Sequence, residues 1–114
     1  MKKVTINDHQ ICYSIFNNKD SKSLKAISDK LLDNKPNTVS ILISKSENKV
    51  TSVIGVSSNL TDKLDAVDLI RFATPILGGK GGGGKKELAQ GGGVEPSKSE
   101  EAISKTIDYI KSKI

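Results

Sequence analysis

The alternation of apolar and polar side chains predicts several β-strands along the chain. In most of these stretches the apolar residues recur at every second position, which is the period of a strand with one buried face. Only the polar residues 45–49 separate the two longest stretches, and residues 46–49 are turn-like, so we expect these two strands to form an antiparallel hairpin. The expected strands are residues 4–6, 11–16, 38–44, 50–56 and 88–90.

Three further stretches carry apolar residues at three- and four-residue spacing, which predicts amphipathic helices. Asp20 or Ser21 is a suitable N-cap for the first helix, and Asp65 for the second. Pro75 is expected to kink or end the second helix near Thr74. The apolar faces are Leu24, Ile27, Leu31 and Leu32, then Ala66, Leu69, Ile70, Ala73, Ile76 and Leu77, then Ile103, Ile107, Ile110 and Ile114.

The order of these elements predicts the fold class. The third helix is expected to begin with a capping box, formed by Ser97 and Glu100 directly after Pro96. Strands alternating with helices favour an α/β (α+β) fold, a mixed sheet of about four to five strands with helices packed on it and a glycine-rich loop before the C-terminal helix. The length of 114 residues fits a single domain over residues 1–114.

Composition narrows the class of protein. A hydrophobic content of 35% approaches that of ordinary globular domains once glycine is added, which disfavours general disorder. No apolar run approaches the ~18–20 residues of a membrane span, so we expect no membrane partner. The N-terminal lysines precede no apolar segment, so we expect no secretory signal. The single cysteine, Cys12, excludes a disulfide scaffold and is expected to be a core thiol, in keeping with a cytoplasmic location.

The chain is mildly basic, with 18 Lys and Arg residues, 13 Asp and Glu residues and a formal net charge of +5. This charge would steer the protein towards polyanions without identifying one. Two Tyr, two Phe and no Trp leave too few rings for a platform on which single-stranded bases stack.

Nine of the ten glycines lie in residues 78–93, which read GGKGGGGKKELAQGGG. Gly79, Gly84 and Lys85 match the spacing of a phosphate-binding Walker loop, but Lys86 stands where that loop has Ser or Thr. The spacing of a dinucleotide-binding motif also occurs, but a run this rich in glycine contains it by chance and no strand precedes the run. Both kinds of nucleotide loop are therefore disfavoured.

Composition alone leaves two interpretations of the glycine segment. Lys80, Lys85 and Lys86 among bare backbone amides would make a phosphate-contact surface, since glycine lets a partner approach the backbone closely. A flexible linker has the same composition. The helix expected after the segment favours the first interpretation, because a tether is more natural at a chain end or between domains.

The segment resembles the signature near the C-terminus of alanyl-tRNA synthetases, G-G-K-G-G-G-G-R-P-D-M-A-Q-A-G-G, in the DHH-associated domain family. Residues 78–84 match this signature directly, as do Ala89, Gln90 and residues 92–93. The resemblance extends upstream to a hydrophobic strand and a V-S-x-x-L-T turn, and it covers essentially the whole chain.

Lys85 and Lys86 depart from the family signature, which has Arg and Pro at these positions. Lysine keeps the charge of arginine but loses its bidentate phosphate geometry. Without proline, the segment is also less rigid. We therefore expect binding to be more electrostatic and less shape-specific than the signature implies.

The resemblance implies a C-terminal domain of an alanine–tRNA ligase, which grips the outer corner of tRNA and supports aminoacylation and editing by the parent enzyme. The implied partners are tRNA, the remaining domains of the parent synthetase and a second copy in a homodimer. The parent enzyme would use ATP, magnesium and zinc, but this chain is expected to hold no cofactor, no catalytic residue and no metal, since His9 and Cys12 are too few to form a zinc site. The expected nucleic-acid-binding residues are Lys80, Gly81, Gly82, Gly83, Gly84, Lys85, Lys86 and Gln90.

Two alternative functions stay open. The first is the substrate-binding domain of a DHH-type phosphoesterase acting on short nucleic acids or cyclic dinucleotides. Domains of that kind resemble this one but carry a His shortly after the glycines, and no His follows His9 here. The second is a dimerisation or interaction module, which exposed apolar surface on either isoleucine-rich helix would support.

Overall fold

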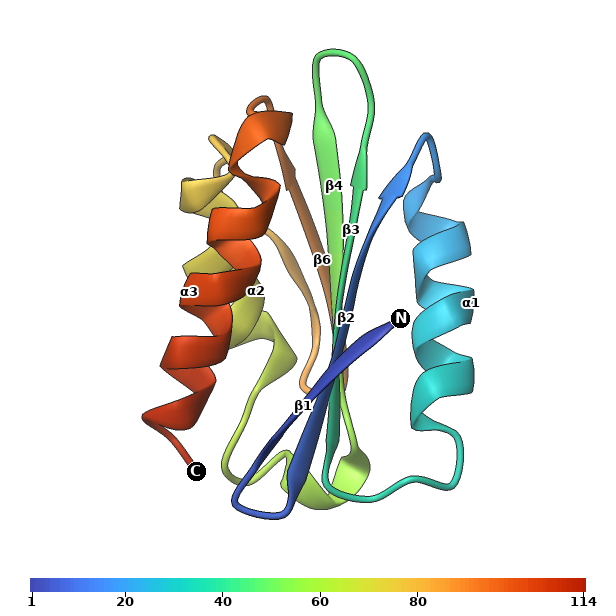
Figure 1. The fold of residues 1–114 in the computed structure, drawn as a ribbon, viewed down its shortest axis with the longest axis vertical. Helices are drawn as coiled ribbons and strands as arrows, with labels where there is room; N and C mark the ends of the chain where they lie inside the picture. The colour runs from blue at the N-terminus through green and yellow to red at the C-terminus, as the bar shows by residue number, and fades with distance from the viewer.

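A six-stranded sheet forms the middle layer of the computed structural model, which describes residues 1–114 (Figure 1). The strands are β1 (Lys2–Ile6), β2 (His9–Asn17), β3 (Thr38–Lys45), β4 (Val50–Val56), β5 (Gly83–Lys85) and β6 (Leu88–Gly93). They lie in the order β1-β2-β3-β4-β6-β5. β2 and β3 are parallel and every other neighbouring pair is antiparallel, so the sheet is mixed, as predicted.

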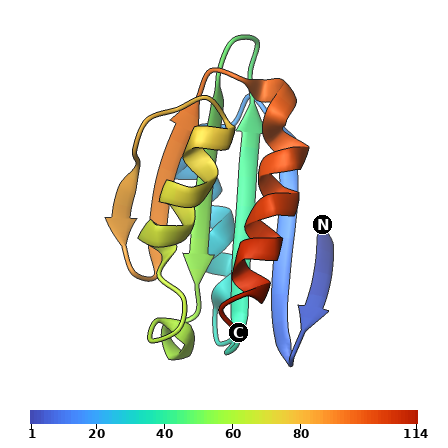
Figure 2. The same ribbon diagram turned by 90° about the vertical axis from the view of Figure 1, so that its left-hand side faces the viewer.

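Helices cover both faces of this sheet (Figures 1 and 2). α1 (Ser21–Leu32) lies on one face, and α2 (Ala66–Ile76) and α3 (Ser99–Lys111) lie on the other. α1 makes the crossover that connects the parallel strands β2 and β3. Two 3₁₀ turns, Ser58–Leu60 and Pro96–Lys98, follow β4 and β6. None of the helices is long and apolar enough to cross a membrane.

The two faces of the sheet differ in how they are packed. Between the sheet and α2 and α3 lies a core of 18 buried residues, contributed by four strands, both helices and the segments next to α2. The face under α1 has a smaller buried cluster of Leu24, Leu42 and Val53. Cys12 is buried, which confirms the prediction of a core thiol. Fewer apolar side chains therefore hold α1 against the sheet than hold α2 and α3.

The glycine segment is where the structure departs most from the predicted fold. The sheet has six strands rather than four to five, because residues 83–85 form β5 instead of part of a loop. The predicted strand at residues 88–90 is confirmed and continues to Gly93. Glycine is disfavoured in strands, so the local pattern gives no strand signal over either glycine run.

The predicted N-caps of the first two helices are confirmed. Oδ1 of Asp20 accepts a 2.8 Å hydrogen bond from the backbone N–H of Ser23. Oδ1 of Asp65 accepts one of 2.8 Å from the backbone N–H of Val67. Each carboxylate therefore satisfies a donor that the first turn of its helix leaves free.

The predicted capping box of the third helix is wrong. Residues Pro96–Lys98 form a 3₁₀ turn, and α3 begins only at Ser99 without a side-chain cap. The hydroxyl of Ser99 instead donates a 2.7 Å hydrogen bond to the carbonyl of Pro96. Since the 3₁₀ turn occupies the first positions of the pattern, Ser97 is not at the boundary where it could cap α3.

Pro75 does not end its helix at the predicted position. α2 runs through Pro75 to Ile76, and Gly78 follows with a left-handed φ of +77°. The Oγ1 atom of Thr74 donates a 2.7 Å hydrogen bond to the carbonyl of Ile70. Because Pro75 lies in the last turn, its missing N–H costs one hydrogen bond next to the helix end rather than breaking the interior.

Replacing Asp65 with Ala should destabilise the chain by about 1 kcal/mol, because the N–H of Val67 loses its acceptor. For a domain of this size, this corresponds to a fall in Tm of about 4 °C, which circular dichroism can follow. Asp62→Ala is the matched control, since Asp62 is an exposed neighbour whose side chain makes no hydrogen bond. An equal fall in Tm in both variants would mean that the lost negative charge, rather than the lost N-cap, destabilises the chain.

Candidate functional site

The glycine segment forms a β-hairpin at one edge of the sheet (Figure 2). In this hairpin Gly83 of β5 lies opposite Gln90 of β6, and Lys85 lies opposite Leu88. β6 pairs with β4 on its other side, whereas the outer side of β5 pairs with no strand. The backbone polar groups on the outer side of β5 are therefore unpaired at the edge of the molecule.

Close packing against α2 explains four of the nine glycines in this segment. A Cβ atom at any of the four would lie less than 3.0 Å from an atom of Ile70, Thr74 or Leu77. Only glycine lets the hairpin backbone approach the helix so closely. These glycines therefore have a structural reason within the fold and need no ligand to account for them. The four are Gly79, Gly82, Gly91 and Gly93.

Gly81 and Gly83 differ from these four, because a Cβ atom at either would meet nothing within 4 Å. Gly81 has a φ of +75°, so its backbone conformation favours glycine. Gly83 has neither a positive φ nor a close neighbour. It is a glycine that the fold itself does not require, and it leaves a stretch of backbone uncovered.

A surface hollow of about 680 Å³ lies between this hairpin and α1. Lys25 of α1 lines one side, and residues 82–85 and 88–91 line the other. By the strand register, Gly83, Lys85 and Gln90 project from the sheet face that α1 covers, which brings them to this hollow. We call it the α1–hairpin hollow.

Gln90 is the polar side chain of β6 that lines the α1–hairpin hollow. Its Oε1 atom is buried and has no hydrogen-bond partner. No hydrogen bond of the structure involves this side chain, so it does not tie the hairpin to its own backbone. An amide in this state has hydrogen-bonding capacity that the protein does not use.

The three lysines of the segment are exposed, and none is in an ion pair. Lys85 lines the α1–hairpin hollow, whereas Lys80 precedes β5 and Lys86 lies in the turn between β5 and β6. The carbonyl of Lys86 accepts a 2.8 Å hydrogen bond from the N–H of Ala66, which ties this turn to the start of α2. The side chains of all three lysines are thus free to meet an anion.

The structure brings part of the predicted site together and leaves part of it apart. Gly82, Gly83, Gly84, Lys85 and Gln90 share the lining of one hollow, whereas Lys80, Gly81 and Lys86 lie outside that lining. Sequence reasoning missed Lys25, which lines the same hollow from α1. Lys25 lies far from the glycine segment in the sequence, and no pattern links the two. Only the fold shows that they line the same hollow.

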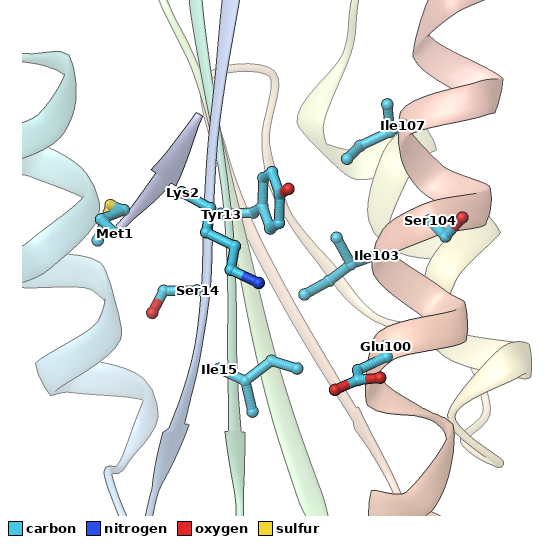
Figure 3. A pocket seen from close by; sticks show the side chains of 9 residues that line it. All are labelled: Met1, Lys2, Tyr13, Ser14, Ile15, Glu100, Ile103, Ser104 and Ile107. Atoms are coloured by element: carbon cyan, nitrogen blue, oxygen red, sulfur yellow. The ribbon is translucent and has the colours of Figure 1, made fainter. Parts of the chain in front are cut away.

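A second hollow of about 610 Å³ lies on the other side of the sheet, near its opposite edge (Figure 3). Ile15 of β2 and Ile103 of α3 point towards each other across it. None of the predicted site residues lines it. The exposed large hydrophobic side chains are those of Met1 and Val94, neither of them in α2 or α3. Neither isoleucine-rich helix exposes a large hydrophobic side chain. The structure therefore gives no support of this kind to the alternative function of an interaction module.

The three groups whose pKa is shifted lie away from the hairpin. A hydrogen bond from the backbone of Ser23 lowers the pKa of Asp20, and the Lys105 ammonium lowers that of Glu101. No three His, Cys, Asp or Glu side chains lie close enough to hold a metal ion. What the hairpin offers a partner is cationic charge, bare backbone and one amide.

The pKa of Tyr109 is raised above 10.0, because its hydroxyl donates a 2.7 Å hydrogen bond to the Asp68 carboxylate. Since the folded-state pKa exceeds the unfolded one, this stabilisation is complete below pH 10.0 and is lost as the pH rises through the folded-state pKa. We expect Tm to fall above pH 10.0, and to fall less in Tyr109→Phe. Tyr13→Phe serves as the control, and an identical pH dependence in all three proteins would contradict this assignment.

The chain was compared with models of known protein families. A family model described as the DHHA1 domain matches residues 8–112. The chain belongs to the DHHA1 domain family. This confirms the family that the glycine signature predicted.

Curated relatives of this DHHA1 domain are alanine–tRNA ligases. That of Staphylococcus saprophyticus is 41% identical over 93 residues, which are 82% of this chain and 10% of the relative. That of Staphylococcus aureus is 35% identical over 107 residues, which are 94% of this chain and 12% of the relative. The chain thus spans about a tenth of the length of the curated relatives it matches.

Two solved structures are similar to this chain. The C-Ala domain of Aquifex aeolicus alanyl-tRNA synthetase matches with a TM-score of 0.92 and 33% identity, over 97% of this chain and 99% of that one. A DHH-domain member of the s1p family of ribosomal proteins matches with a TM-score of 0.62 and 13% identity, over 96% of this chain and 27% of that one. The second likeness shows the fold alone. The first confirms both the mixed α/β fold and the resemblance to a synthetase C-terminal domain.

Proposed function

We propose that this DHHA1 domain binds tRNA as the C-terminal domain of an alanine–tRNA ligase, and that it contacts the tRNA backbone through the glycine hairpin. It would support aminoacylation and editing by the other domains of the parent enzyme, in the cytoplasm. One observation carries the proposal: three exposed lysines without ion-pair partners lie on or beside an edge strand whose outer backbone is unpaired.

The chemistry of this edge suits the backbone of folded RNA. Double-helical RNA is recognised mainly through its shape, its phosphates and its 2′-hydroxyls, and seldom through stacking on aromatic rings. Lysine ammonium groups supply the phosphate contacts. At Gly83 no side chain stands between the protein backbone and a partner, so a phosphate or hydroxyl can reach the unpaired groups of β5.

Titration of the 114-residue chain with intact alanine-specific tRNA at several salt concentrations tests this function. We expect binding at low salt that weakens linearly on a log–log plot, with a slope of about −0.7 to −0.9 per neutralised phosphate. Duplex DNA of equal length is the competitor, and tRNA should be preferred. Failure to bind tRNA at low salt, or equal binding of the duplex DNA, would contradict the proposal.

A further inference from the structure

We propose that the α1–hairpin hollow holds one unstacked nucleotide of the bound RNA, with its phosphate between Lys25 and Lys85 and its base edge on the amide of Gln90. This inference rests on the proposed function and extends it from the exposed hairpin to the face of the sheet that α1 covers. It adds Lys25, a residue that the glycine signature does not contain.

Gln90 is the first reason to expect a ligand in the hollow. Its Oε1 atom is buried without a partner, which costs stability in a folded protein. A leucine of similar size would avoid that cost, so a glutamine here is better explained by a partner that the isolated chain lacks. A base edge fits, because an amide offers both a donor and an acceptor to the edges of an unpaired base.

Lys25 and Lys85 place positive charge on both sides of the hollow. One side of α1 faces the hairpin. It carries Lys25, Asp29 and Leu32, which recur at helical spacing. Lys25 is half-buried, and its ammonium forms no ion pair with Asp29 or any other carboxylate. Two cations facing each other across one hollow favour a shared anion.

The shape of the hollow selects a single nucleotide. Its volume of about 680 Å³ lies within the ~300–1,000 Å³ of small-ligand sites. Leu88 gives it an apolar side against which a base can rest, and the missing side chain at Gly83 keeps it open. A base that remains paired in a helix cannot enter such a site, so the nucleotide must come from an unpaired loop.

Two variants test the subsite in the tRNA titration, with Lys30→Ala as a matched control on an exposed position of α1 that lines none of these hollows. Lys25→Ala should weaken binding and flatten the salt slope by about 0.7–0.9. Gln90→Leu should weaken binding about fivefold to thirtyfold with an unchanged slope, as expected for the loss of an uncharged base contact. Its Tm should be equal to that of the wild type or higher, which separates lost contact from lost fold.

A fully paired RNA duplex should bind the wild type and Gln90→Leu equally well, because it offers no free base. If Lys25→Ala and Gln90→Leu bind tRNA like the wild type, the subsite is overturned while the proposed function stands. An equal loss of duplex and tRNA binding in Gln90→Leu would also overturn it. If the wild type binds no tRNA at low salt, the proposed function fails and the subsite with it.

Discussion

Replacing Gly93 with Ala should destabilise the chain by about 3 kcal/mol, at the upper end of the cost of overpacking a core. The new Cβ would lie less than 3.0 Å from the carbonyl carbon and oxygen of Leu77, directly after α2. These are backbone atoms, so no side-chain rotation can relieve the contact. Either α2 moves away from β6 or the strand pairing with Val50 is disturbed. Thermal unfolding should show a fall in Tm of about 10 °C or more.

Gly83→Ala is the matched control, since both glycines belong to the same hairpin and both variants add one methyl group. A Cβ at Gly83 meets nothing within 4 Å, and its φ is not positive. Its stability should therefore be unchanged or raised by up to about 1 kcal/mol through the less flexible unfolded chain. If the two variants lose equal stability, the close packing of α2 on the hairpin does not account for Gly93.

Local rules were enough for much of the fold. Asp20 and Asp65 cap their helices because a carboxylate before an apolar helical pattern satisfies the first free N–H groups. The hairpin of β3 and β4 follows from two apolar runs with a short polar link. In each case the deciding residues are neighbours in the sequence, so the pattern carries the information.

The glycine strands depend on contacts that no local pattern contains. β5 forms because β6 offers a pairing partner, while glycines outside β5, such as Gly82 and Gly91, let the hairpin backbone approach α2 closely. Glu95 starts the 3₁₀ turn that replaces the capping box predicted at Ser97. Its N–H donates to the carbonyl of Leu77, and its carbonyl accepts from the N–H of Lys98. In both segments, contacts with residues distant in the sequence determine the secondary structure.

The candidate site divides in the same way. Lys80, Lys85 and Lys86 could be predicted because they lie among the glycines, but their spacing does not show that only Lys85 faces the α1–hairpin hollow. Lys25 reaches this hollow because α1, which connects β2 to β3, packs over β3 and β4, next to β6 of the hairpin. For Gln90, the signal is a buried Oε1 atom without a hydrogen-bond partner, which no sequence pattern shows.

Replacing Lys80, Lys85 and Lys86 together with Ala should weaken tRNA binding by roughly 10- to 100-fold at low salt and flatten the log–log salt slope by about two to three. Each lysine is exposed and in no ion pair, so its loss removes a phosphate contact without breaking an interaction within the fold. The unfolding temperature should stay close to that of the wild type. A triple variant with normal binding and an unchanged slope would show that the hairpin does not contact RNA.

The decisive control replaces Lys3, Lys49 and Lys111, three exposed lysines that lie outside the hairpin and in no ion pair. Both triple variants lower the formal net charge of +5 by three, so they weaken general attraction to a polyanion equally. If the lysines act only through net charge, both variants lose the same affinity. If the hairpin is the contact surface, the hairpin triple loses more affinity and more salt slope, because only its lysines displace counterions from bound phosphates.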